Sequence, residues 1–336
     1  MNPIPVTVIG GYLGAGKTTL VNHLLRNAGG ERIAVLVNDF GDVGIDAELI
    51  ESREGDLINL AGGCVCCSFG SDLVAALMRL PKMSPPPQRV LIETSGVALP
   101  RAVARTVSLA GGLATDAVVV LADAETVRER AADRYVGDTV LGQLREADLL
   151  VLNKVDLVGT EALARLHQWL RTNAPQAAVL DARRGAVAPA LLYGPARQDA
   201  GSASRPAAGT ALFAGQPAGT ATLAAHGAES SFESLSWRFD TAIDVALLAT
   251  QLRRPELGLA RAKGLVSDES GRGWIVQLAG RRVETVERGP VAPDGGGTLV
   301  CIGARGPFDR TALIESLREL GPGKPVSPGG PPHPQA

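Results

Sequence analysis

The sequence is poor in aromatic residues, histidine and cysteine, and its net charge is close to zero. Aromatic residues make up 4% of the 336 positions, so leucine, valine, isoleucine and alanine must fill the interior. Lysine and arginine number 33 against 35 aspartates and glutamates, which gives a formal charge of −2. This balance argues against a nucleic-acid-binding protein, because such a protein needs a cationic face.

Segments that could enter a membrane are also lacking. The longest uncharged run, residues 206–228, is interrupted by Gly, Pro, Thr and Gln. The first residues carry neither the basic region nor the long apolar core of a signal peptide. Three of the four cysteines crowd together and the fourth is far away, which is not a disulfide framework. We therefore expect no membrane association and a reducing cytoplasm as the setting.

Residues 1–193 alternate short β-branched runs with longer amphipathic segments. Nearly continuous apolar strands that alternate with helices predict a mostly parallel sheet covered on both faces, the doubly wound α/β fold. Hydrophobic residues, at 45% of the chain, suffice for such a buried core. The predicted strands are Val6–Gly10, Ile33–Asn38, Arg89–Glu93, Ala117–Ala122, Leu149–Asn153 and Ala178–Asp181.

The remainder of the chain divides into three parts by composition. Residues 194–231 are rich in Ala, Gly, Ser, Thr and Pro without periodicity, which predicts a flexible linker. Residues 232–321 regain strand and helix patterns and predict a smaller α+β domain. Residues 322–336 are rich in Pro and Gly, and we expect a disordered tail there.

A glycine-rich motif follows the first predicted strand and opens a helical pattern. It fits the Walker A pattern of P-loop nucleotide-binding proteins without a mismatch. Backbone N–H groups of such a loop surround phosphate oxygens, and the amino end of the helix adds partial positive charge. Lys17 would reach the β- and γ-phosphates, and the Thr18 hydroxyl would ligate Mg²⁺. The residues predicted to bind nucleotide here are Gly11, Gly14, Ala15, Gly16, Lys17, Thr18 and Thr19.

A second motif, Asn153-Lys154-Val155-Asp156, ends a predicted strand further along the chain. The Asp156 carboxylate can accept hydrogen bonds from N1 and N2 of guanine, which adenine cannot offer. The Lys154 stem would lie along the base plane, and Asn153 would tie this loop to the P-loop. Because the motif follows a P-loop in a chain of alternating strands and helices, guanine binding is favoured over the alternative that the motif is a plain polar turn.

Between these motifs, an apolar strand ends in an acidic residue, with a glycine three residues later. This spacing suits a Glu93 carboxylate near Mg²⁺ and a Gly96 N–H group that faces the γ-phosphate. We therefore predict a catalytic set of Lys17, Thr18, Glu93 and Gly96. An ordinary strand end is the alternative interpretation.

Cys64, Cys66 and Cys67 place three thiols within four residues, too close for a normal structural disulfide. Thiolates favour Zn²⁺ or another soft or borderline metal. Three thiolates leave a tetrahedral ion one ligand short, and an open site of this kind suits metal transfer. Redox chemistry and buried structural cysteines stay open as alternatives.

The order of these motifs resembles that of CobW-like GTPases, relatives of the HypB and UreG metallochaperones. The resemblance rests on the P-loop, the cysteine cluster and the segments Asn38–Gly41, Glu93–Gly96 and Asn153–Asp156. In the second domain it rests on Arg261–Gly264, Trp274 and Leu299–Gly303 before a final helix. It implies a GTPase that delivers a metal, often zinc, from the cysteine cluster to client proteins, with a switch acid that helps to hold the metal.

Asp39 and Asp42 are the candidate switch acids, because they follow the second predicted strand. Either could meet Mg²⁺ or the cysteine-bound metal, and a solvated acidic turn is the alternative. The family often has Glu at these places, so the carboxylates here reach one methylene less far. Many members also carry a His-rich linker, whereas this linker offers only His226, which weighs against a metal-concentrating role.

From the sequence we expect a Mg²⁺-dependent GTPase metallochaperone that uses GTP/GDP and prefers Zn²⁺ as its cargo. Its partners would be metal-dependent client proteins, and a homodimer stays open. Alternatives are cobalt or iron delivery, including cobalamin synthesis, a P-loop small-molecule kinase, and a nucleotide-gated interaction module. Because Val97 follows Gly96, the glutamine that orients water in Ras-type enzymes has no counterpart, and we expect slow hydrolysis.

Overall fold

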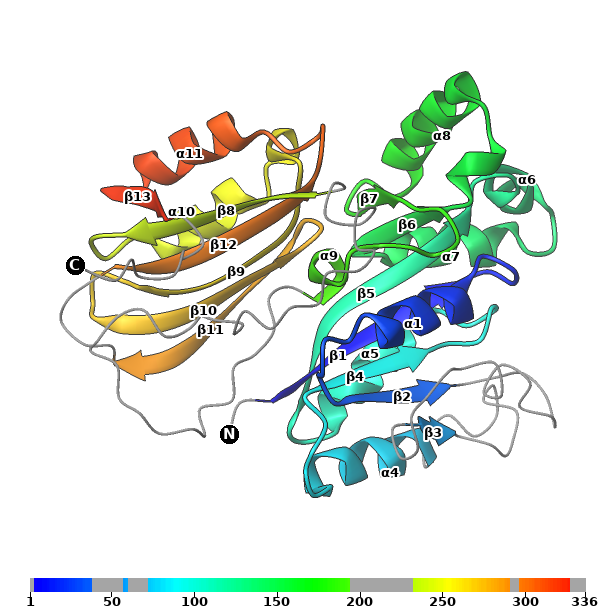
Figure 1. Cartoon of the computed structure of the whole chain (residues 1–336), viewed down its shortest axis with the longest axis horizontal. Helices are drawn as coiled ribbons and strands as arrows, with labels where there is room; N and C mark the ends of the chain where they lie inside the picture. The colour runs from blue at the N-terminus through cyan, green and yellow to red at the C-terminus, as the bar shows by residue number, and fades with distance from the viewer. Residues whose placement is uncertain (1–2, 38–56, 60–71, 194–231, 291–295, 327–336) are drawn as a thin grey trace, which may run out of the picture. The chain divides into compact units, whose positions relative to one another are not determined.

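The computed structural model describes residues 3–37, 57–59, 72–193, 232–290 and 296–326. The chain separates into two compact units, residues 1–193 and 194–336 (Figure 1). Each unit has its own sheet and its own hydrophobic core. The two units are therefore described separately.

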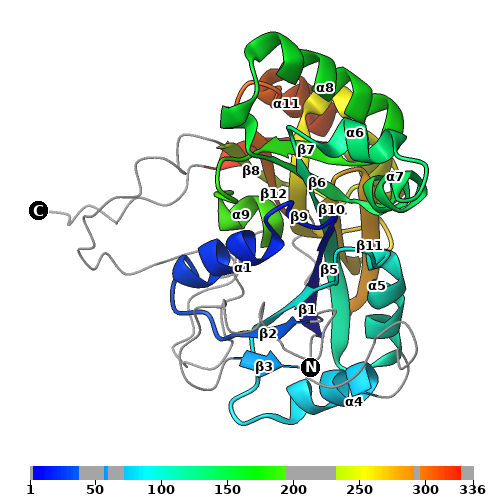
Figure 2. The ribbon, with the colours of Figure 1, turned by 90° about the vertical axis from the view of Figure 1, so that its right-hand side faces the viewer.

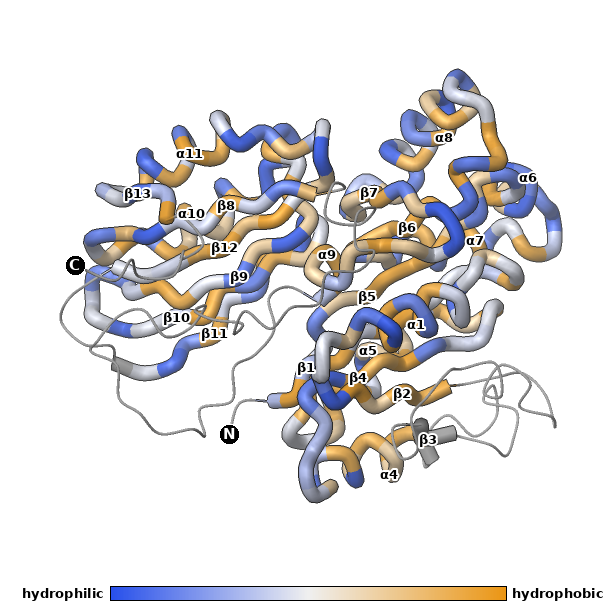
Figure 3. Tube along the Cα trace, in the orientation of Figure 1, coloured by the Kyte–Doolittle hydropathy of each residue, from blue (hydrophilic) through white to orange (hydrophobic). Residues whose placement is uncertain are grey.

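The first unit contains a seven-stranded sheet in the order β3-β2-β4-β1-β5-β6-β7, and every neighbouring pair is parallel. This arrangement confirms the predicted parallel α/β sheet. Its strands are β1 (Ile4–Gly11), β2 (Ile33–Val37), β3 (Leu57–Asn59), β4 (Arg89–Glu93), β5 (Leu113–Asp123), β6 (Leu149–Asn153) and β7 (Ala178–Asp181). Strands β2, β4 and β6 are buried along their whole length, as near-continuous apolar runs predict (Figure 3).

Helices cover both faces of this sheet. Helices α1 and α9 lie on one face, and α5 and α7 lie on the other (Figure 2). The bounds are α1 (Lys17–Arg26), α4 (Asp72–Arg79), α5 (Pro100–Leu109), α6 (Val127–Ala132), α7 (Gly137–Glu146), α8 (Thr160–Asn173) and α9 (Pro189–Tyr193). Because all strands are parallel, their carboxyl ends meet at one edge of the sheet, and the loops that bear the predicted motifs gather there.

A buried charged cluster lies near the opposite, amino-terminal edge of the sheet. Arg89 begins β4 and is only 3% exposed. Its Nε lies 3.3 Å from Glu31 Oε2, and its Nη1 lies 3.7 Å from Asp116 Oδ2. The Arg89 guanidinium also lies 4.1 Å from the centre of the Tyr193 ring, and burial raises the pKa of that phenol. The cluster thus attaches the end of α9 to the sheet.

The second unit is a six-stranded antiparallel sheet in the order β11-β10-β9-β12-β8-β13. Its strands are β8 (Phe232–Phe239), β9 (Leu259–Ser267), β10 (Arg272–Ala279), β11 (Arg282–Pro290), β12 (Gly297–Ala304) and β13 (Gly323–Val326), and its helices are α10 (Val245–Leu252) and α11 (Arg310–Glu319). The core includes fully buried Trp237, Phe239, Leu299 and Cys301. The antiparallel sheet together with α10 and α11 confirms the predicted smaller α+β domain.

One boundary prediction was wrong for residues 323–326, whereas residues 327–336 of the same predicted tail lie outside the described residues. Residues 322–336 were expected to be a disordered tail, yet β13 pairs with β8 in an antiparallel register, with Pro325 opposite Trp237. A proline has no N–H to give to a ladder, but β13 is an edge strand, where one side needs no partner. The short sequence Gly-Lys-Pro-Val therefore becomes a strand through its neighbour and not through its own propensity.

Helix α10 begins at Val245, directly after its N-cap residue Asp244. The Asp244 carboxylate accepts hydrogen bonds from the backbone N–H groups of Ala246 and Leu247, at 2.8 and 2.9 Å. This is an N-cap, which satisfies donors that the helix itself leaves open.

Among the described residues, no helix combines the length and the apolar character needed to cross a membrane.

Candidate functional site

The P-loop connects β1 to α1, and two of its glycines are required by close contacts. Gly11 has φ 131°, and a Cβ there would lie 2.4 Å from the backbone oxygen of Leu121. Gly16 has φ 100°, and a Cβ there would lie 2.4 Å from Nδ2 of Asn153. Side chains at either position would therefore push the loop away from β5 or β6.

Lys17 begins helix α1 and is only 9% exposed. Its Nζ donates to the backbone oxygen of Gly11 at 3.1 Å, so the ammonium lies over the loop that precedes it. The first turn of α1 contains no acidic residue. The amino end of α1 thus combines the partial positive charge of a helix N-terminus with a cation, the arrangement that binds phosphate.

Thr18 and Glu93 meet at the carboxyl edge of the sheet. The Thr18 hydroxyl donates to Glu93 Oε1 at 2.9 Å, and Glu93 is 2% exposed at the end of β4. A hydroxyl oxygen beside a buried carboxylate is a donor set that Mg²⁺ accepts. These two residues fit the expected magnesium ion.

Asn153, at the end of β6, bridges two segments. Its Nδ2 donates to the backbone oxygen of Ala15 at 2.9 Å, and its Oδ1 accepts from the N–H of Gly185 at 2.9 Å. The tie to the P-loop was expected from the sequence. The second contact adds the turn after β7, where Gly185 packs against the backbone of Leu20 in α1.

Lys154 and Asp156 follow Asn153 on the exposed side of this edge. Lys154 takes a left-handed conformation with φ 61°, and its Nζ lies 2.7 Å from Asp123 Oδ2 at the end of β5. Asp156 is exposed in a short 3₁₀ turn, Val155–Leu157. An exposed carboxylate at this place can accept hydrogen bonds from a ligand without losing an internal partner.

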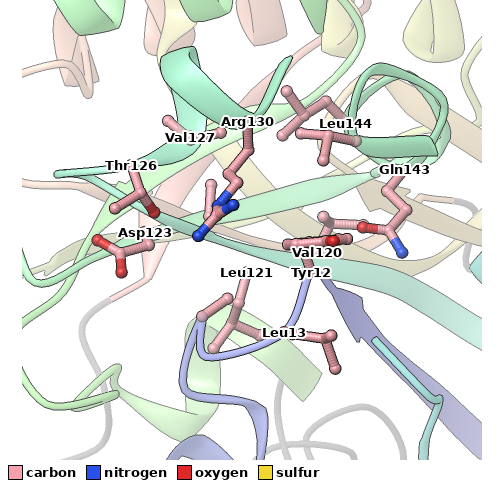
Figure 4. A pocket seen from close by; sticks show the side chains of 13 residues that line it. Tyr12, Leu13, Val120, Leu121, Asp123, Thr126, Val127, Arg130, Gln143 and Leu144 are labelled. Atoms are coloured by element: carbon pink, nitrogen blue, oxygen red, sulfur yellow. The ribbon is translucent and has the colours of Figure 1, made fainter. Parts of the chain in front are cut away.

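Gly96 lies against the P-loop. A Cβ at Gly96 would come within 2.4 Å of Leu13 Cδ2 and 3.0 Å of the Leu13 backbone nitrogen. Next to this contact is a small pocket in the first unit, shown in Figure 4, which Tyr12, Leu13, Arg130 and Gln143 help to line. The segment after β4 and the P-loop are therefore close neighbours.

The predicted ligands of the transported metal lie outside the described residues. These are Cys64, Cys66, Cys67, Asp39 and Asp42. Within the part of the chain that the structure describes, no three His, Cys, Asp or Glu side chains come together in a way that could hold a metal ion. Cys301 is fully buried in the second unit.

The sequence interpretation missed three residues of this site: Asp123, Gln143 and Gly185. Asp123 ends a buried strand, and its position beside the ends of β1 and β6 could have been inferred from the parallel alternation. Gln143 and Gly185 are distant in the chain from the residues that they contact, and no local pattern marks them.

A seven-stranded parallel sheet, a P-loop and a tethered Asn-Lys-x-Asp segment define a P-loop nucleotide-binding protein of the GTPase type. Residues 5–181 match the family described as CobW/HypB/UreG, nucleotide-binding domain. Residues 232–321 match the cobalamin synthesis protein cobW C-terminal domain. The chain therefore belongs to the CobW/HypB/UreG family.

Curated relatives include a zinc chaperone CobW from Sinorhizobium sp, 33% identical over 223 residues, with 57% of this chain and 62% of that protein covered. A zinc-regulated GTPase metalloprotein activator 1 from Schizosaccharomyces pombe is 34% identical over 180 residues, with 51% of this chain and 43% of that protein covered. The chain thus spans less than two thirds of either relative. A solved Zn(II)-bound YjiA GTPase from E. coli has 23% identity and a TM-score of 0.44, with 95% of this chain and 99% of that chain covered.

Proposed function

We propose that the chain is a Mg²⁺-dependent GTPase that binds a divalent metal, preferably zinc, at Cys64, Cys66 and Cys67 and delivers it to metal-dependent client proteins. The observation that supports this most is the Asn153 amide, which attaches the predicted guanine-binding segment to the P-loop. A nucleotide bound by the loop then has its base beside Asp156. The relatives named as zinc chaperones and as a zinc-regulated GTPase support zinc as the cargo.

The phosphates would be held at the amino end of α1. Lys17 would exchange its contact with the Gly11 carbonyl for the β- and γ-phosphates. Thr18 and Glu93 would hold Mg²⁺, which when bound neutralises developing charge on the phosphates. The backbone groups that would surround the phosphates belong to Gly11, Gly14, Ala15, Gly16, Thr18 and Thr19.

Guanine would be selected at the ends of β6 and β7. Asp156 would accept from N1 and N2 of the base, and the Lys154 stem would lie along the base plane. Lys154 is already held by Asp123, and Asn153 by the P-loop and Gly185. Because these side chains are fixed before the ligand arrives, little ordering is needed on binding.

The reaction would be hydrolysis of GTP to GDP and phosphate. The Gly96 N–H would face the γ-phosphate, and Val97 offers no group to orient water. Groups that position water or stabilise charge raise GTPase rates by roughly 10³–10⁵ when a partner supplies them. We therefore expect the purified protein alone to hydrolyse GTP slowly and a metal-loaded client complex to raise the rate. Lys17→Ala should abolish hydrolysis.

The metal would be bound by three thiolates, with Asp39, Asp42, water or a client side chain as the fourth ligand. Because thiolates must form before the metal binds, metal affinity should fall as pH falls. If GTP changes zinc affinity, zinc must change GTP affinity by the same factor. That reciprocity distinguishes a nucleotide-controlled carrier from a passive metal site.

The test is a titration of the purified chain with zinc, GTP and ATP. We expect one zinc ion per chain, lost when the three clustered cysteines are changed to serine and retained in the control Cys301→Ala. We also expect strong preference for GTP over ATP, narrowed by Asp156→Ala. Undiminished zinc stoichiometry in the triple variant would place the metal elsewhere, and equal affinity for both nucleotides would exclude guanine selectivity.

A further inference from the structure

The segment between β4 and α5, residues 94–99, follows Glu93 directly and contains Gly96. Its first backbone N–H, from Thr94, donates to the Ile9 oxygen of β1 at 2.9 Å. A turn follows, in which the Ala98 N–H donates to the Ser95 oxygen at 3.2 Å. Two carbonyl oxygens of the segment, those of Gly96 and Ala98, point out of this turn to a distant residue.

That residue is Gln143 of α7. Its Nε2 donates to the Gly96 oxygen at 3.0 Å and to the Ala98 oxygen at 2.9 Å. A glutamine amide has two N–H donors, and both are used here. Since both partners are carbonyl oxygens, which only accept, the amide nitrogen must be the group that faces them. Gln143 is 1% exposed, so water cannot replace these bonds at low cost.

Gly96 is held from two directions in the chain. Its carbonyl is bound by Gln143, while its Cα lies so close to Leu13 that a Cβ would collide. These two contacts fix the backbone N–H of Gly96 relative to the P-loop. Gly96 lies 47 residues before Gln143 in the chain. Few conformations of the Gly96 peptide satisfy both contacts.

We propose that Gln143 is a positioning residue, which holds the Gly96 peptide where its N–H can reach the γ-phosphate and so makes the site favour GTP over GDP. This rests on the proposed GTPase function. A glutamine that merely anchors α7 would support GTP and GDP binding equally, because both nucleotides use the same P-loop and base contacts. GTP and GDP differ by the γ-phosphate, so an effect of Gln143 on GTP affinity but not on GDP affinity indicates a positioning role and not an anchoring role.

The test compares Gln143→Met with the unmutated chain. Methionine has a similar length and no donor, so both hydrogen bonds are lost without a large cavity. Affinities for the non-hydrolysable analogue GMPPNP and for GDP are measured with Mg²⁺ present. We expect the preference for GMPPNP over GDP to fall by about tenfold, as the loss of one to two buried hydrogen bonds implies.

Val140→Ala is the matched control, one turn earlier in the same helix. It removes buried packing and lowers the melting temperature, but it should leave the GMPPNP-to-GDP preference unchanged. An equal loss of both affinities in Gln143→Met, or an unaltered preference, would overturn the proposal.

Hydrogen exchange on the unmutated chain keeps the proposal testable if the variant fails to fold. The amide of Gly96 should exchange more slowly with GMPPNP than with GDP, and equal exchange would overturn the proposal. Failure of the proposed GTPase function can also be distinguished from failure of the proposed role of Gln143. Equal GTP and ATP affinity in the unmutated chain defeats the proposed function, whereas intact guanine selectivity with an unaltered GMPPNP-to-GDP preference defeats only the role of Gln143.

Discussion

The Thr18 hydroxyl donates a hydrogen bond of 2.9 Å to Glu93 Oε1, across 75 residues of sequence. The contact joins the first turn of α1 to the end of β4. Glu93 ends β4, and Thr18 lies in the helix that follows β1, the strand that pairs directly with β4. The edge of a parallel sheet thus brings two oxygen ligands together before any cation binds.

Glu93→Gln tests this pair. The amide keeps the size and one acceptor oxygen but loses the negative charge. We expect GMPPNP affinity to fall by about 10- to 100-fold with Mg²⁺, in line with ~1.5–3 kcal/mol for a charged hydrogen bond, and to change little in EDTA. Isothermal titration in both buffers measures this, with exposed Glu125→Gln as the control. An equal fall in both buffers would show that Glu93 does not act through magnesium.

Asn153→Ala should destabilise the first unit. The buried oxygen of Ala15 and the N–H of Gly185 would both lose their partner, at a cost of about 2–4 kcal/mol. Urea unfolding measures the change. Asn173→Ala is the control, because that amide donates only to a carbonyl one turn earlier in its own helix, and we expect less than ~0.5 kcal/mol there. Similar losses in the two variants would contradict the bridging role.

Cys301 should be inert to alkylation in the native protein. It is fully buried, and burial raises the pKa of its thiol, so the reactive thiolate is scarce. Mass spectrometry after iodoacetamide treatment at pH 8 should find this cysteine unmodified until urea is added. Modification of the folded chain at the rate of a free thiol would contradict the burial. If Cys301 does not react in the folded protein, any protection of thiols from alkylation by zinc must come from the clustered cysteines Cys64, Cys66 and Cys67.

Asp268 should make the second unit sensitive to acid. Hydrogen bonds from Ser270, Trp274 and Arg272 lower the pKa of its carboxyl to about 2. Because the folded pKa lies below the unfolded value of about 3.9, the stabilisation is present above about pH 4 and is lost as pH falls towards 2. Asp268→Asn should therefore lower the melting temperature at pH 7 and differ little from the unmutated chain near pH 2. A difference that stays constant with pH would exclude the carboxylate as its source.

Local patterns predicted the elements whose ends are marked in the sequence. Strands β4, β6 and β7 begin and end at the predicted residues, because polar or acidic residues bound short apolar runs. Strand β13 was missed because its pairing with β8 outweighs a Gly-Lys-Pro-Val sequence that favours turns. The two bonds of Gln143 were missed for a related reason, since they depend on how α7 packs and not on its own composition.

Strand β4 has Glu93 at one end and Arg89 at the other, roughly 13 Å apart at about 3.3 Å per residue. Arg89 holds Tyr193, the last residue of the first unit. The chain therefore leaves this unit near the edge of the sheet that bears no nucleotide ligand. Every residue proposed to bind phosphate, Mg²⁺ or guanine lies within residues 1–193, so we expect an isolated segment of residues 1–193 to retain the affinity of the full chain for guanine nucleotides.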